Sequence, residues 1–88
     1  MLYSRIYLDD DAWEFHILRM FEYRDGGQNL AVRVERKNNP KAFCEWRLPD
    51  VISDKSFGFS EQEILYMENY LKNNESIMWD DYREEMKR

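Results

Sequence analysis

Long apolar runs and cysteines are scarce in this 88-residue chain. It holds no stretch of about 18 consecutive apolar residues, the length that a membrane-spanning helix needs, so no transmembrane helix is expected. Its single cysteine, Cys44, excludes an internal disulfide and is typical of a reducing cytoplasm. The first residues also lack the basic segment followed by an apolar stretch that marks a signal peptide. We therefore expect a cytoplasmic protein without a membrane partner.

Residues for catalysis and ligand binding are equally few. His16 is the only histidine, and a catalytic histidine needs an orienting acid together with a nucleophile or substrate. One histidine and one cysteine fall short of the four ligands of a structural zinc site. Neither a GxGxxG nor a P-loop motif occurs. The sequence thus predicts no enzyme, no catalytic residue, no metal, no cofactor and no small-molecule substrate, and a structural or incidental His16.

Three adjacent carboxylates, Asp9, Asp10 and Asp11, have two interpretations. A calcium loop spaces its acidic residues at alternate positions and includes a glycine, and this segment does neither. We predict a turn here in preference to a metal site.

Composition and charge indicate one folded domain over residues 1–88. Hydrophobic residues make up 43% of the chain and aromatics 16%, which is typical of a packed core. The net charge of −5 lies entirely in the second half, because residues 1–48 carry eight basic and eight acidic side chains. An acidic second half suits a solvated helix surface, and less well a docking face for a basic partner or a phosphate mimic.

A β-hairpin between Trp13 and Glu35 is the strongest local prediction. Asp25-Gly26-Gly27-Gln28 supplies the residues of a tight turn. Apolar and polar residues alternate on both flanks, which predicts one buried face. The alternation places these residues on that face: Trp13, Phe15, Ile17, Phe21, Tyr23, Leu30, Val32 and Val34.

Two further strands are predicted beside the hairpin. Residues 2–8 alternate, with Leu2, Ile6 and Leu8 inward. Residues 42–48 follow a turn at Lys37–Lys41 and end at Pro49, because proline cannot donate to a β-ladder. Ala42, Cys44, Trp46 and Leu48 are expected to point inward. Residues 50–58 are predicted to be a loop, so residues 1–48 form an antiparallel meander of three to four strands.

Two helices are predicted in residues 59–88. Ser60 followed by Glu63 is a capping box, and Phe59 with Ile64 occupies the positions of a hydrophobic staple. The first helix is expected to end near Lys72, because Asn73-Asn74 favours a helix end. Its buried stripe is Ile64, Met67, Tyr70 and Leu71; that of a second helix, over residues 75–87, is Met78, Trp79, Tyr82 and Met86. The predicted class is α+β, with both helices packed on one face of the sheet.

The segment from Phe59 to Glu84 resembles the end of a family of small bacterial proteins of unknown function that are often encoded near toxin–antitoxin genes. The matching residues are Phe59-Ser60 at the cap, Leu71, Asn73-Asn74 and Trp79. The sheet half lacks that family's Pro-Pro-His-type segment. The resemblance implies a bacterial, cytoplasmic and non-enzymatic protein.

The sheet face without helices is the predicted binding surface. The alternation places apolar, aromatic and arginine side chains there, which are enriched in interfaces. The candidate residues are Tyr3, Arg5, Tyr7, Leu18, Met20, Arg33, Phe43 and Arg47, and His16 shares their face.

Two functions can use such a face. The favoured hypothesis is a protein-interaction module: a homo-oligomer, or an inhibitor or antitoxin-like protein that caps a protein partner. The alternative is single-stranded nucleic-acid binding, in which bases stack on aromatics and arginines meet phosphates. The net charge of −5 disfavours this alternative, because phosphate contacts dominate nucleic-acid affinity.

Overall fold

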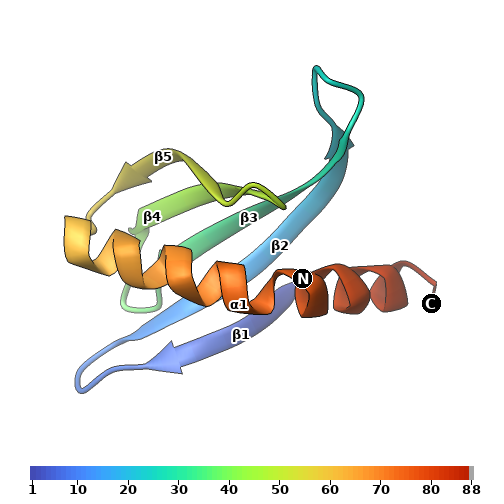
Figure 1. Ribbon diagram of the computed structural model, residues 1–88. Helices are drawn as coiled ribbons and strands as arrows, with labels where there is room; N and C mark the ends of the chain where they lie inside the picture. Colours follow the sequence, from blue (N-terminus) through green and yellow to red (C-terminus); the bar gives the residue numbers. More distant parts are fainter. Residues whose placement is uncertain (88) are drawn as a thin grey trace.

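The computed structural model describes residues 1–87 as one antiparallel sheet followed by one helix (Figure 1). The strands lie in the order β1-β2-β3-β4-β5, so each is hydrogen-bonded to its neighbour in the chain. The elements are β1 (Leu2–Tyr7), β2 (Ala12–Glu22), β3 (Gln28–Arg36), β4 (Asn39–Leu48), β5 (Ile52–Phe57) and α1 (Glu61–Met86). The predicted α+β class and the antiparallel meander are confirmed, whereas the numbers of strands and helices differ from the prediction.

The fifth strand replaces the loop predicted for residues 50–58. The chain reverses after Leu48, and β5 then pairs antiparallel with β4, with Phe57 opposite Phe43. The sheet therefore ends at residue 57 and has five strands, not three or four. All six residues of β5 are exposed, so no apolar alternation marks the strand in the sequence.

The turns are close to their predicted positions. The β2–β3 turn is closed by the Gly26 N–H donating to the Tyr23 carbonyl, 2.9 Å, and Gly26 has a φ of 80°. This turn spans Tyr23–Gly26, two residues earlier than predicted, and Gln28 already belongs to β3. Asp9–Asp11 lies between β1 and β2 as predicted, and the Asp11 carboxylate accepts from the Ala12 N–H. The second turn is shorter than predicted, because β4 begins at Asn39.

The core lies between the sheet and α1. The sheet contributes its inner face to this core. That face consists mainly of the residues of β2, β3 and β4 that were predicted to point inward. Three of them, Phe15, Ile17 and Val32, have no exposed surface. Phe15 meets Tyr70 of α1 with ring centroids 4.5 Å apart. Ala42, Cys44, Trp46 and Leu48 are likewise buried, as the alternation predicted.

The helix begins at the predicted capping box. The Ser60 Oγ accepts from the Glu63 N–H at 3.1 Å, and the Glu63 Oε1 accepts from the Ser60 N–H at 2.7 Å. One nitrogen of Arg36, Nη2, also donates to both carboxylate oxygens of Glu63, at 2.9 and 2.8 Å. Phe59 and Ile64 both pack against the core, as expected for residues that flank a cap. The cap therefore ties the start of α1 to the end of β3.

The two predicted helices are a single helix of 26 residues. Asn74 does not end it, because both groups of its amide are satisfied within a continuing helix. The Asn74 Nδ2 donates to the Tyr70 carbonyl, and its Oδ1 accepts from the Tyr3 hydroxyl of β1 at 2.9 Å. Met67, Leu71, Met78 and Trp79 are buried as predicted. Met86 is not part of the stripe, because its side chain is 63% exposed.

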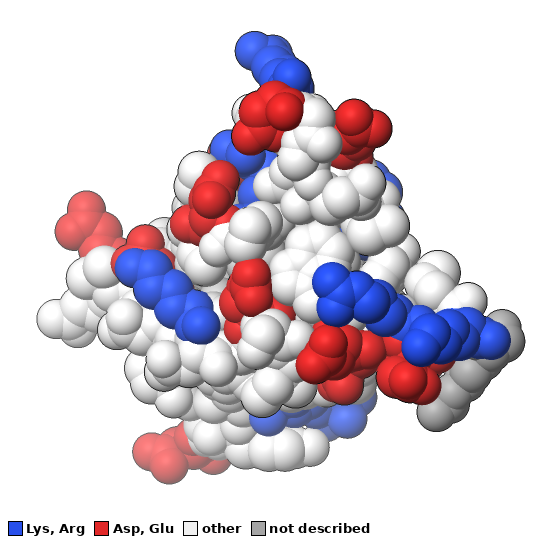
Figure 2. Space-filling view, turned by 45° about the vertical axis from the view of Figure 1, so that its right-hand side comes forward, with Lys and Arg blue, Asp and Glu red and all other residues white. Residues whose placement is uncertain are grey.

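No helix within residues 1–87 has the length and apolar character that crossing a membrane would require. The helical half is strongly acidic, as the sequence indicates. In Figure 2, however, acidic and basic side chains lie interspersed among uncharged ones, and the visible face has no large patch of one sign.

Replacing Glu63 with glutamine should make stability less dependent on pH. Burial by itself raises the pKa of Glu63, but hydrogen bonds from the Ser60 backbone and from Arg36 outweigh it, so the pKa lies below the ordinary 4.5. A lowered folded-state pKa stabilises the protein above the ordinary value, and this contribution disappears as pH falls through the folded value. Glutamine keeps the cap but loses the charge.

Urea unfolding at pH 7 and pH 3 measures this effect. We expect the wild type to be more stable than Glu63→Gln at pH 7, and we expect this difference to be smaller at pH 3. Glu61→Gln is the matched control, because Glu61 lies in the same first turn of α1. An equal loss in both variants at pH 7 would assign the effect to the helix dipole and not to Arg36.

Candidate functional site

The candidate site is the outer face of the sheet, the side opposite α1. Six predicted residues lie there: Arg5, Tyr7, Leu18, Arg33, Phe43 and Arg47. Their placement follows from strand register. Arg5 pairs with Glu14, and Arg33 pairs with Glu45. The residues that alternate with these four along their strands face the core. Tyr7 is 71% exposed and Leu18 45%, so this face does present apolar surface.

Tyr3 was wrongly predicted to lie on the outer face. The register of β1 shifts between Leu2 and Ser4, so Tyr3 is an extra residue in the ladder. Such a bulge redirects the side chain. The Tyr3 hydroxyl donates to Asn74 of α1, and burial raises its pKa, with the nearby Tyr70 and Asp81 adding to the shift. Tyr3 therefore connects β1 to the helix.

Met20 was also wrongly predicted to lie on the outer face, because a bulge interrupts its strand too. The register of β2 shifts between Ile17 and Arg19, with Leu18 as the unpaired residue. Beyond the bulge Met20 pairs with the buried Leu30, and its N–H donates to the Tyr82 hydroxyl of α1. Met20 thus lines an open groove of about 620 Å³ beside Trp79 on the helix side.

The same bulge turns two predicted core residues outward. Phe21 lines a shallow cavity of about 120 Å³ on the outer face, together with Leu18 and Arg19. Tyr23 lies beneath the Arg47 guanidinium, whose carbon is 4.2 Å from the ring centroid. Tyr23 is 38% exposed. The outer face is therefore more aromatic at the hairpin end than the alternation predicted.

The three predicted arginines are all engaged with carboxylates. Arg5 Nε donates to the Glu14 Oε2 at 2.7 Å, and Arg33 Nε donates to the Glu35 Oε2 at 2.8 Å. A second Arg33 nitrogen reaches Glu45 at 3.3 Å. The hydrogen bond from Arg5 holds the pKa of Glu14 below its ordinary value.

Arg47 has the same kind of partner. Its Nε lies 3.1 Å from both oxygens of Asp54, and this hydrogen bond raises the pKa of the guanidinium. Two arginines also cover aromatic rings, because Arg33 lies 4.2 Å from the centroid of Phe43 just as Arg47 does over Tyr23. Cation–π contacts of this kind hold the guanidinium against the ring.

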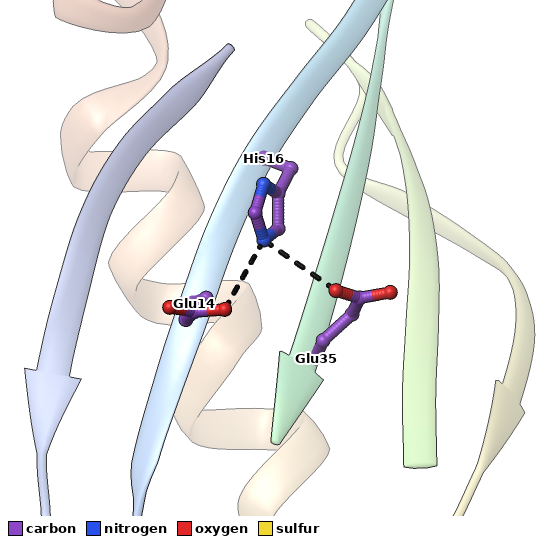
Figure 3. A group of neighbouring side chains, drawn as sticks. All are labelled: Glu14, His16 and Glu35. Atoms are coloured by element: carbon purple, nitrogen blue, oxygen red, sulfur yellow. Dashed lines mark ion pairs between the residues drawn. The ribbon is translucent and has the colours of Figure 1, made fainter. Parts of the chain in front are cut away.

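His16 lies near the centre of this face. Its Nε2 is 3.5 Å from Glu14 and 3.5 Å from Glu35, and Figure 3 shows the three side chains pointing toward one another from β2 and β3. Cys44 lies on the inner face, where burial raises the pKa of its thiol. Cys44 and His16 therefore lie on opposite faces of the sheet, as predicted.

Sequence reasoning missed the contribution of β5. Phe57 is paired with Phe43 and Ile52 with Arg47, which places both on the outer face. Phe57 is 64% exposed and Ile52 41%. The approach of Glu35 to His16 was also missed, because it depends on the β2–β3 register. Only the alternation of Arg33 and Glu35 in the sequence could have suggested that Glu35 shares this face.

The fold and this face define a class: a single-sheet α+β domain with one helix on the inner face and a charge-paired outer face. Comparisons with known protein families, with curated proteins and with solved structures found no match for this chain. The outer face itself therefore carries the functional argument.

Proposed function

We propose that this protein is a non-enzymatic protein-interaction module that binds through the outer face of its sheet. The observation that supports this proposal is that apolar side chains are exposed on a face of the sheet that α1 does not cover. Leu18, Ile52 and Phe57 are 45%, 41% and 64% exposed. Arg19, Ala31, Arg47 and Ile52 form one row across four strands, and Leu18 adjoins its β2 end. Exposed apolar groups among polar ones are typical of interfaces.

The ion pairs of this face favour a protein over a nucleic acid. Single-stranded nucleic acids require free arginines for phosphates and open aromatic rings for bases. Arg5, Arg33 and Arg47 already bind carboxylates. Phe43 and Tyr23 are each covered by an arginine. A nucleic acid would have to break these contacts in a protein that carries a net charge of −5.

The proposed biological role is that of an inhibitor or antitoxin-like protein in the bacterial cytoplasm. The resemblance of residues 59–84 supports the setting. The small size and the open sheet face support a module that caps a partner. A homo-oligomer formed through the same face is the second form of this proposal.

The test is an affinity capture from bacterial lysate with the wild type and with Leu18→Ser/Phe57→Ser. Both side chains are exposed, so the variant should fold normally. Interface anchors of this type contribute about 2 kcal/mol or more each, so we expect partner affinity to fall at least about tenfold. Captures are run with and without nuclease, at low and moderate salt.

Leu65→Ser/Ile77→Ser is the matched control, because it removes two apolar side chains of similar exposure, 58% and 51%, from α1. This control should retain the partner. Light scattering on all three proteins tests self-association through the same face. Equal binding by both variants, or recovery of nucleic acid that is lost at moderate salt, would contradict the proposal.

A further inference from the structure

Three side chains with metal-binding atoms converge on the outer face of the sheet (Figure 3). Glu14 and His16 are two residues apart in β2, so strand geometry places them on the same face. Glu35 of β3 lies directly opposite Glu14. One carboxylate oxygen from each glutamate and a histidine nitrogen lie within 4.8 Å of one another. Two like charges opposite each other destabilise a sheet, so a compensating positive charge is required.

The two nearby arginines each contact only one oxygen of the carboxylate beside them. Arg5 binds the Oε2 of Glu14, and Arg33 binds the Oε2 of Glu35. The Oε1 atoms of both glutamates instead lie toward His16. The arginines thereby fix the orientation of the two carboxylates and leave one oxygen of each directed at a common point.

Among residues 1–87, the histidine nitrogen at this point has no partner at the distance and angle of a well-formed hydrogen bond. His16 Nε2 is shielded from solvent, and its distance of 3.5 Å to each Oε1 exceeds that of a charge-assisted hydrogen bond, about 2.7–2.9 Å. A buried polar atom without a partner is costly and therefore needs a cause. Its position between two carboxylate oxygens suggests that all three atoms face a common ligand.

Two of the three donor separations fit a transition-metal ion, and the third, between the two glutamate oxygens, lies within 4.8 Å. Zinc binds imidazole nitrogen and carboxylate oxygen at about 2.0–2.2 Å, so two ligands at a tetrahedral angle have donor atoms about 3.4 Å apart. The separations from His16 Nε2 to the two glutamate oxygens are both 3.5 Å. Calcium and magnesium prefer oxygen ligands alone, which disfavours them here.

We propose that Glu14 Oε1, His16 Nε2 and Glu35 Oε1 form a binding site for a divalent transition-metal ion of the zinc type. Three protein ligands leave a fourth position open to water or to a group from a partner. Arg5 and Arg33 act as outer-shell residues that orient the ligating carboxylates. The inference does not depend on the proposed interaction function, because ion binding is measurable on the isolated protein.

The site is tested by titrating the full, untagged chain with zinc and with cobalt(II). A polyhistidine tag must be avoided, because His16 is the only histidine of the chain. Calorimetry should give one ion per chain, and cobalt should produce visible absorption. In NMR spectra zinc should shift the ring signals of His16. Zinc should also raise the melting temperature, since an ion that binds only the folded state stabilises it.

Variants separate this site from other acidic groups of the chain. His16→Gln and Glu35→Gln should each weaken zinc binding at least about tenfold, a loss typical of disturbed metal sites. Glu22→Gln is the matched control: it removes the same charge from β2 and lies outside the cluster. Circular dichroism confirms that each variant is folded.

Three results would overturn the proposal. The first is wild-type zinc affinity in His16→Gln, which would place the ion at another group such as Asp9–Asp11. The second is an equal loss in Glu22→Gln, which would indicate general attraction by negative charge. The third is the absence of saturable binding by the wild type at millimolar zinc. If zinc binds and the partner capture fails, the interaction proposal alone is wrong.

Discussion

Replacing Leu71 with alanine is expected to lower the free energy of unfolding by about 3 kcal/mol. Leu71 has no exposed surface and lies in the helix stripe that packs on the sheet. Alanine removes three carbon atoms and leaves a cavity that the rigid sheet cannot fill. A domain of 88 residues has a total stability of about 4–13 kcal/mol, so the loss is a large fraction of it.

Thermal and urea unfolding measure this loss directly. At about 4–8 °C per kcal/mol, the melting temperature should fall by roughly 12–24 °C. Leu65→Ala is the matched control, because it makes the same chemical change in the same helix at a side chain that is 58% exposed. Its effect should stay within about 0.5 kcal/mol. Equal destabilisation by the two variants would mean that the buried face of α1 is assigned wrongly.

Replacing Gly58 with alanine is expected to cost about 2–4 kcal/mol. Gly58 has a φ of +83°, which L-residues rarely adopt, and an added Cβ would lie 2.6 Å from the Cβ of Ala42. Ala42 is itself buried and cannot move away without disturbing β4. Backbone strain and steric overlap therefore add at this position.

Gly26→Ala separates the two contributions. Gly26 has nearly the same φ, +80°, but the nearest atom to an added Cβ is a glutamate oxygen at 3.9 Å. It should show the backbone cost alone, about 1–2 kcal/mol. In urea unfolding, the double variant Ala42→Gly/Gly58→Ala should lose less than the sum of its single changes, because the overlapping Cβ is gone. Strict additivity would contradict the predicted overlap.

The sequence predicted those parts of the fold that rest on local patterns. The β2–β3 hairpin, the capping box at Ser60 and the inward residues of β4 each follow from neighbouring residues, and all are confirmed. Strand β5 has no such pattern, because its six residues are exposed and its position depends on pairing with β4. Asn74 favours a helix end in isolation, but its bonds to Tyr3 and Tyr70 satisfy it within α1.

The candidate face was predictable wherever strands alternate without interruption. Arg5, Arg33 and Phe43 lie outward as expected, whereas Tyr3 and Met20 do not. A bulge adds one residue to a strand, so every side chain after the bulge points to the opposite face of the sheet. Nothing in a single sequence fixes the position of the bulge. The approach of Glu35 to His16 is equally a consequence of register between two strands.

During synthesis, all five strands leave the ribosome before α1, because the helix follows them in the chain. Until then the inner face of the sheet, with side chains such as Phe15 and Trp46, has no cover. Exposed apolar surface of this kind attracts chaperones and other nascent chains. The hydrogen bond between Tyr3 and Asn74 joins residues 71 positions apart, so this link between β1 and α1 forms only when the middle of the helix has been made. Folding of the complete domain is thus a late event, which follows translation of the helix.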